Sequence, residues 1–264
     1  MAKNSSAPKN QKAAAARAQA QKSVKAQERR TTLGIVVGAV IALLVFGGIV
    51  FYIVQSSQVP ALDDESAVVP QASDTQTGGI PVGSGGVVGE DVPADAPQLD
   101  IYLDFMCPIC GQFEDINAED IAAMRENGDI QLNYHPVSIL DRYSNGTEFS
   151  TRAANAAATV ADAAPASFVD FVDGMFANQP AEGTDGLSDE QIEQIAIDAG
   201  VPEDVAATLD DGLFTKWVIA ATERASQDGM QGTPTVMLDR EVLSQQEDVS
   251  YFQPGALRTY IEGL

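Results

Sequence analysis

Hydrophobic positions are distributed very differently along successive parts of the chain. Residues 33–54 form a run of 22 residues without a charge, which is long enough to cross about 30 Å of hydrocarbon as a helix. Residues 55–78 are rich in Ser, Asp, Gln and Pro and have little apolar periodicity, as is typical of a flexible linker. The pattern therefore predicts one transmembrane helix over 33–54, a flexible linker over 55–78 and a folded domain over 79–264.

The folded domain begins with a strand–helix–strand pattern, and residues 79–82 leave open whether another strand precedes it. A short run of apolar, β-branched and aromatic residues over 99–105 predicts a strand. Helical spacing of apolar residues follows, and Gly128 is a typical C-terminal stop. Alternation over 130–134 predicts the next strand, which we expect His135-Pro136 to interrupt.

Residues from about 147 to 230 are predicted to be helical almost throughout. Apolar residues over 168–176 recur at helical spacing, and Ser188 begins a capping-box pattern that is completed by Gln191. A strand pair then follows the helical block, and the final helix is expected over about 254–262. This order predicts an α/β fold in which helices cover both faces of a sheet and an all-helical region is added.

Charge is distributed unevenly and gives the predicted span a direction. Residues 1–32 hold eight Lys or Arg and one acid, whereas the rest of the chain holds seven basic and 37 acidic residues. Basic residues before the span and acids after it predict a cytoplasmic basic tail over 1–32 and an extracytoplasmic domain. A cleaved signal peptide is the alternative, although the apolar run is long for one. So acidic a domain argues against nucleic-acid binding.

The two cysteines of the sequence, Cys107 and Cys110, lie in one Cys-x-x-Cys motif. A structural zinc site needs about four ligands, and His135 is the only histidine, so no metal site is expected. A structural disulfide is an open alternative, but so small a loop stabilises a fold by only about 2 kcal/mol. Redox use explains the position as well as the spacing, because N–H groups and the dipole at a helix N-terminus stabilise a thiolate.

The two sulfurs are expected to have different roles. Cys107 at the helix start is predicted to be the exposed nucleophile with a lowered pKa. Cys110 lies one helical turn inside and is predicted to be the shielded thiol that resolves a mixed disulfide. Pro108 fits the first helical turn, and Ile109 adds no charge that would stabilise the thiolate further.

Three segments resemble the DsbA-like branch of the thioredoxin superfamily. They are Asp104-Phe105-Met106-Cys107-Pro108-Ile109-Cys110-Gly111, His135-Pro136 and Gly232-Thr233-Pro234-Thr235. The resemblance covers about residues 79–264 and implies a thioredoxin-like sheet with a helical domain inserted at about 147–230. It also implies that Pro234 is a cis-proline facing the cysteines, and that Thr233 and Pro234 bind an extended substrate segment. An ordinary trans proline is the alternative.

One departure from the thioredoxin pattern concerns proton transfer. Relatives often keep a buried acid six residues before the first cysteine, where this chain has Ile101. Asp104 and Glu114 are the nearest carboxylates and are therefore the candidate proton relay to Cys110. His135 is expected to be a structural residue at a strand end and not a partner of the thiolate.

These observations predict an extracytoplasmic protein-disulfide oxidoreductase, anchored in the cell membrane by a single span. Oxidation of cysteine pairs in exported proteins is the leading hypothesis. A membrane-tethered reductase or isomerase keeps the chemistry but reverses its direction, and a non-enzymatic binding module with a structural disulfide is the third hypothesis. No cofactor is expected. The resemblance further implies a quinone-coupled membrane partner that re-oxidises the cysteines. The predicted span is expected to contact the lipid bilayer.

Overall fold

The computed structural model describes residues 33, 35–51, 62, 67–92, 94–243 and 249–264. The chain divides into two units, residues 1–58 and 59–264. In the first unit, residues 35–51 are helical and expose their large apolar side chains. Among the residues described, no helix is both long enough and apolar enough to cross a membrane. The predicted tail over 1–32, and residues 34 and 52–54 of the predicted span, lie outside the described residues.

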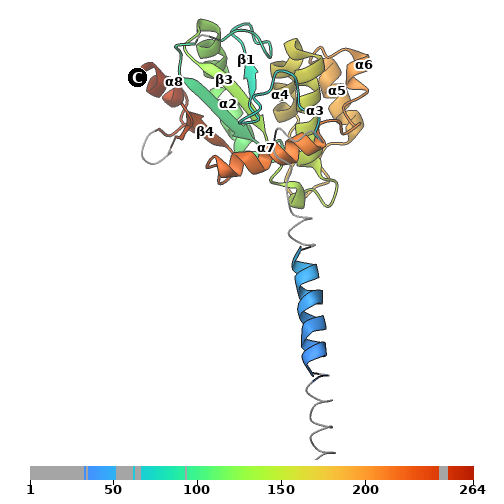
Figure 1. Cartoon of the computed structure of the whole chain (residues 1–264). Coiled ribbons are helices and arrows are strands. Elements are labelled where there is room, and N and C mark those ends of the chain that lie inside the picture. Colours follow the sequence, from blue (N-terminus) through green and yellow to red (C-terminus); the bar gives the residue numbers. More distant parts are fainter. Residues whose placement is uncertain (1–32, 34, 52–61, 63–66, 93, 244–248) are drawn as a thin grey trace, which may run out of the picture. The chain divides into compact units, whose positions relative to one another are not determined.

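The second unit combines one sheet with helices (Figure 1). Its strands are β1 (Ile80–Val82), β2 (Gln98–Leu103), β3 (Gln131–Pro136), β4 (Thr235–Leu238) and β5 (Glu241–Val242). Its helices are α2 (Pro108–Asn127), α3 (Phe149–Ala163), α4 (Phe168–Ala177), α5 (Asp189–Asp198), α6 (Glu203–Ala206), α7 (Thr215–Gln227) and α8 (Ala256–Glu262), with short 3₁₀ turns η1 (Asp141–Tyr143) and η2 (Pro165–Ser167).

Strand β2 lies at the centre of the five-stranded sheet, whose order is β1-β3-β2-β4-β5. It pairs with β3 in parallel and with β4 antiparallel, and β1 and β5 are antiparallel edge strands. Helix α2 connects the parallel pair β2 and β3, as such crossovers require. Five of the six residues of β2 are buried, because a central strand covered by helices has no solvent-facing side. The cysteine motif therefore directly follows the buried central strand of the sheet.

The predicted helical block is present between β3 and β4. Helices α3 to α6 lie together beside the sheet, and α7 leads from them back to β4 (Figure 1). Trp217 of α7 and the apolar face of α4 are buried, so they form core contacts as the periodicity indicates. Ser188 and Gln191 form the predicted capping box at the start of α5.

Two local predictions were wrong. His135-Pro136 does not interrupt the strand predicted over 130–134. This strand is β3, and it continues through Pro136, which pairs with Leu103. Residues 67–78 of the predicted linker are packed on the domain, where Ser73 and Thr77 are buried and the backbone N–H of Gln71 donates to the Asp162 carboxylate at 2.8 Å. Short polar residues can form such turns with few apolar contacts, which is why composition alone suggested a linker.

Candidate active site

The cysteine motif lies where β2 ends and α2 begins. Cys107 is the N-cap of α2 and Pro108 is its first residue. The carbonyl of Cys107 accepts the backbone N–H groups of Cys110 at 2.9 Å and Gly111 at 3.2 Å, so the motif forms the first turn of the helix. The proline fits because its missing N–H would have no partner in this turn. The strand-to-helix junction predicted from the sequence is therefore present.

A second segment completes the site from far along the chain. The peptide bond between Thr233 and Pro234 is cis, as the resemblance implied. The thiol of Cys107 donates to the backbone carbonyl of Thr233 at 3.2 Å, although the two residues are 126 positions apart. The structure thus brings together four of the predicted site residues, Cys107, Cys110, Thr233 and Pro234, and whether the last two bind substrate stays a prediction.

The two thiols differ in their acidity. A hydrogen bond from the Cys110 thiol lowers the pKa of Cys107 to about 6, the Thr233 side chain and the first backbone N–H groups of α2 add to this effect, and burial opposes it. Burial is the main cause that raises the pKa of Cys110 well above the usual range of a thiol. The lowered pKa was predicted, but the neighbouring thiol contributes more to it than the helix N-terminus, which was the cause inferred from the sequence.

The exposure of Cys107, the predicted nucleophile, differs from expectation. Cys107 has 5% of its surface exposed and Cys110 has 1%, and both are free thiols. The prediction of an exposed Cys107 was therefore wrong, because the Thr233 segment lies over its sulfur. The side chain of Ile109 is 48% exposed and is the open part of the motif.

Asp104 is fully buried and its carboxylate accepts four hydrogen bonds. One oxygen accepts the N–H of Met106 at 2.9 Å and the hydroxyl of Ser150 at 2.7 Å. The other accepts the N–H groups of Ile139 at 2.9 Å and Leu140 at 3.0 Å. Burial raises the pKa of Asp104 to about 6, and these bonds oppose the rise. The carboxylate joins the motif to the loop after β3 and to α3, so its geometry is that of a structural acceptor.

Glu114 is the other candidate for the proton relay and has the opposite surroundings. It is 5% exposed, and neither carboxylate oxygen has a hydrogen-bond partner among the described residues. Burial, followed by the charges of Asp173 and Asp115, raises the pKa of Glu114 to about 8. Glu114 follows Cys110 by four residues, so both side chains lie on one side of α2. A protonated carboxyl without a hydrogen-bond partner is better suited to donate a proton than the Asp104 carboxylate, which accepts four hydrogen bonds.

His135, the histidine expected to be structural, contacts residues of β2 and not the cysteines. Its Nε2 atom lies 3.0 Å from the Asp100 carboxylate, and its ring stacks on Tyr102 with the centroids 4.0 Å apart. Ile101, which occupies the position of the buried acid in many relatives, is fully buried in β2. The expectation of a structural histidine therefore agrees with these contacts.

Sequence reasoning did not identify Gln179, which follows α4 in the helical block. Its side-chain Nε2 donates to the backbone carbonyl of Cys107 at 2.8 Å and to that of Phe105 at 3.1 Å. A single Gln at a helix end has no pattern of its own, so no signal in the sequence distinguishes it from a surface residue. The structure nevertheless places its amide directly on the residue that bears the lowered pKa.

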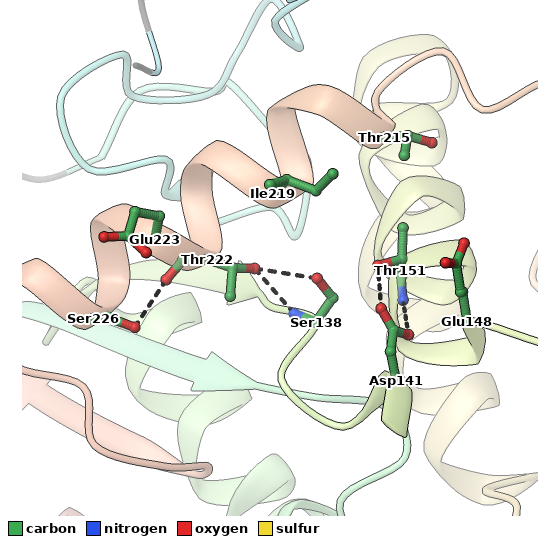
Figure 2. Close-up of a pocket in the computed structure, with 9 residues that line it drawn as sticks. All are labelled: Ser138, Asp141, Glu148, Thr151, Thr215, Ile219, Thr222, Glu223 and Ser226. Carbon is green, nitrogen blue, oxygen red and sulfur yellow. Dashed lines mark hydrogen bonds between the residues drawn. The ribbon is translucent and has the colours of Figure 1, made fainter. Parts of the chain in front are cut away.

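A cavity of about 320 Å³ lies between α7, the loop after β3 and the start of α3 (Figure 2). Its lining is mainly hydroxyl and carboxylate side chains, and neither cysteine is part of it. These polar groups largely bind each other, since Thr222 accepts the N–H of Ser138 at 3.0 Å and the Asp141 carboxylate accepts the Thr151 hydroxyl at 2.6 Å. The cavity is thus separate from the cysteine chemistry.

Comparison with known proteins agrees with this geometry. A protein-family model described as thioredoxin matches residues 87–254. The chain belongs to this thioredoxin family. The match includes the cysteine motif, the helical block and the Thr233-Pro234 segment, so all three belong to one family unit. No curated protein matches the sequence of this thioredoxin-family chain.

The solved structures similar to this thioredoxin-family chain include two that are named as oxidoreductases. MdbA of Actinomyces oris, a thiol–disulfide oxidoreductase, is 25% identical with a TM-score of 0.62 over 79% of this chain and 98% of MdbA. Reduced DsbG of Mycobacterium tuberculosis, a disulfide bond oxidoreductase, is 26% identical with a TM-score of 0.54 over 69% of this chain and 85% of DsbG. Oxidised DsbA of the same organism is 25% identical with a TM-score of 0.55 over 70% of this chain and 98% of DsbA.

Proposed function

We propose that this protein is an extracytoplasmic thiol–disulfide oxidoreductase that oxidises cysteine pairs of exported proteins through a Cys107–Cys110 disulfide. The observation that carries the proposal is the asymmetry of the two thiols. The pKa of Cys107 is lowered to about 6, whereas burial raises that of Cys110. A stabilised thiolate favours the reduced form of the enzyme, and that makes its disulfide a good oxidant.

The proposed reaction has two thiol–disulfide exchanges. A substrate thiolate attacks the sulfur of Cys107 in the enzyme disulfide, which forms a mixed disulfide and releases Cys110 as a thiolate. The second substrate thiolate then attacks the substrate sulfur of the mixed disulfide and releases Cys107 as a thiolate. The substrate gains a disulfide, and the enzyme disulfide is reduced by two electrons. Thr233 and Pro234 are proposed to hold the substrate segment beside Cys107.

Glu114 is proposed to supply the proton that Cys110 takes up. With a pKa of about 8, its carboxyl is protonated at neutral pH, whereas the released Cys110 thiolate is a strong base because burial raises its pKa. Transfer from the carboxyl to the thiolate is therefore favourable, either directly or through water. Asp104 is the weaker candidate because its carboxylate already holds four hydrogen bonds.

We further propose that residues 33–54 anchor the protein in the cell membrane with the catalytic domain outside. The uncharged run between a basic tail and an acidic domain supports this orientation. The exposed apolar side chains of the helical residues 35–51 support the anchoring. Re-oxidation by a quinone-coupled membrane partner completes the proposed cycle. The test is addition of protease to intact cells, which is expected to digest the domain and spare the basic tail.

One observation favours the opposite direction of electron flow, from the enzyme thiols to substrate disulfides. A pKa of about 6 for Cys107 lies nearer to that of thioredoxin, about 7, than to that of the strongest oxidants, about 3.5. A membrane-tethered reductase or isomerase is therefore the second candidate. The deciding measurement is the thermal stability of the full chain in detergent with the cysteines oxidised and reduced. An oxidase is more stable reduced, so greater stability of the oxidised chain would refute the oxidising role.

Two variants test whether the chemistry exists at all. Cys107→Ser is expected to abolish oxidation of a reduced, unfolded test protein. Cys110→Ser is expected to accumulate a mixed disulfide with a disulfide-containing test protein, because the Cys107 thiolate attacks that disulfide and no second cysteine resolves the product. The matched control is Ser226→Ala, which alters an exposed hydroxyl on α7. If oxidation by both cysteine variants equals that of the wild type, the motif has no redox role, and a non-enzymatic binding module is the remaining function.

A further inference from the structure

The contact between Gln179 and the cysteine motif is unusual because it joins the helical block to the backbone of the reacting residue. Gln179 is half-buried, and its Nε2 donates to the carbonyls of Phe105 and Cys107 at 3.1 and 2.8 Å. The Cys107 carbonyl also accepts two N–H groups of α2. The amide of Gln179 is thus an additional donor on a group that belongs to the same residue as the thiolate.

Gly111 provides an independent sign that this contact is closely fitted. A Cβ atom built at Gly111 would lie 2.5 Å from Oε1 of Gln179, which is closer than side-chain atoms can approach. Gly111 is an interior residue of α2, where alanine would normally stabilise the helix by about 1 kcal/mol. The glycine therefore leaves room for the Gln179 amide over the first turn of α2.

A packing contact supports the same junction. The ring of Phe105, whose carbonyl accepts the Gln179 amide, lies 5.1 Å from the ring of Phe176 on α4. Both aromatic side chains are largely buried. The helical block thus contacts the turn before α2 through this apolar pair, the Gln179 amide and the hydrogen bond from Ser150 to Asp104. The Phe105–Phe176 pair can hold the helical block against this turn without the Gln179 amide. The hydrogen bonds of Gln179 therefore need an explanation other than packing of the two parts.

We propose that Gln179 is a positioning residue for the Cys107 nucleophile, through which the helical block fixes the turn that begins α2. The inference rests on the proposed redox role of Cys107. The amide N–H of Gln179 offsets the partial negative charge of the Cys107 carbonyl oxygen near the thiolate. It also fixes the orientation of Cys107, whose sulfur contacts Thr233. Loss of the amide is therefore expected to make the thiolate less stable and to raise the pKa of Cys107.

The test is a titration of the Cys107 thiolate, followed by its ultraviolet absorbance, in the reduced full chain in detergent. Gln179→Ala is expected to raise the pKa of Cys107 by about 0.5 to 1, which is a roughly three- to tenfold loss of thiolate below the pKa. Gly111→Ala is expected to give a similar rise, because its methyl group displaces the amide. The double variant is expected to show no more than the Gln179→Ala effect, since the two changes remove one contact.

The control is Gln194→Ala, which removes an amide on α5 that donates to Asp198 within the same helix. It is expected to titrate as the wild type does. The proposal is overturned if Gln179→Ala lowers the melting temperature but leaves the titration unchanged, or if the two single effects add in full. A wild-type thiol that titrates at the ordinary value and oxidises no test protein overturns the proposed function, and this inference with it.

Discussion

Glu114→Gln is predicted to make the domain more stable at neutral and alkaline pH. Glu114 is almost completely buried, and no group in the described part of the chain hydrogen-bonds its carboxylate. In the folded chain the charged form is therefore disfavoured, whereas in the unfolded chain it is solvated. Glutamine has nearly the same shape and no charge, so the substitution removes the cost of protonating the carboxylate, or of burying it in charged form, when the chain folds.

The magnitude follows from the pKa. Folding raises the pKa of Glu114 from 4.5 to about 8, and each step of one in pKa corresponds to about 1.4 kcal/mol. Because the folded pKa is the higher one, the favourable contribution of the protonated group is complete below pH 4.5 and is lost as the pH rises to about 8. The loss over this window is on the order of 3 to 5 kcal/mol.

The assay is urea unfolding of the reduced full chain in detergent at a series of pH values between about 4.5 and 8. The difference in unfolding free energy between Glu114→Gln and the wild type is expected to grow with pH across this window. Glu119→Gln is the matched control, because Glu119 is an exposed residue of the same helix. It is expected to follow the wild type at every pH.

Parallel pH profiles of the wild type and Glu114→Gln would contradict the raised pKa, because Glu114 would then be ionised in the folded state at an ordinary pKa. A second readout separates stability from chemistry. If Glu114 supplies the proton to Cys110, the more stable glutamine variant should oxidise a test protein more slowly. Faster or equal oxidation would leave Glu114 as a buried carboxyl without a part in proton transfer.

Three further predictions concern other described residues. Alkylation of the reduced chain at Cys107 should increase with pH around a midpoint of about 6, since the thiolate is the reactive form, and a midpoint near that of a free thiol would contradict the geometry. Asp104→Asn should cost about 1–3 kcal/mol of unfolding free energy in urea, because the new amide donor faces the N–H groups of Ile139 and Leu140; Asp115→Asn, at an exposed site on α2, is its control. Ser188→Ala should cost about 1 kcal/mol in the same assay through loss of its capping bond to the N–H of Gln191, and no change would show that this cap is not needed.

Most of the fold could be predicted from periodicity. The apolar spacing of α4, the capping box of α5 and the alternation in β3 each follow from a face that has to be buried. The packing of residues 67–78 could not be predicted, because it depends on single polar contacts such as that of Gln71 with Asp162. The continuation of β3 to Pro136 depends on its partner strand β2, which local sequence does not specify.

The candidate site was predictable only where a motif marks it. Cys107 and Cys110 identify themselves by spacing and by the strand-to-helix junction. The burial of Cys107, three of the four donors on Asp104 and the contact of Gln179 arise from segments that are distant in the sequence. No local pattern encodes such contacts, since each requires the helical block and the sheet to be in place.

The core described above is built from apolar side chains, and the two cysteines of the sequence both lie in the candidate active site. Correct folding of the described domain therefore depends on no disulfide that another protein would first have to introduce. A catalyst whose own fold required its product would be unable to start in a compartment that holds only reduced, newly exported chains. The described domain has no such requirement, because its core packs while both cysteines are free thiols.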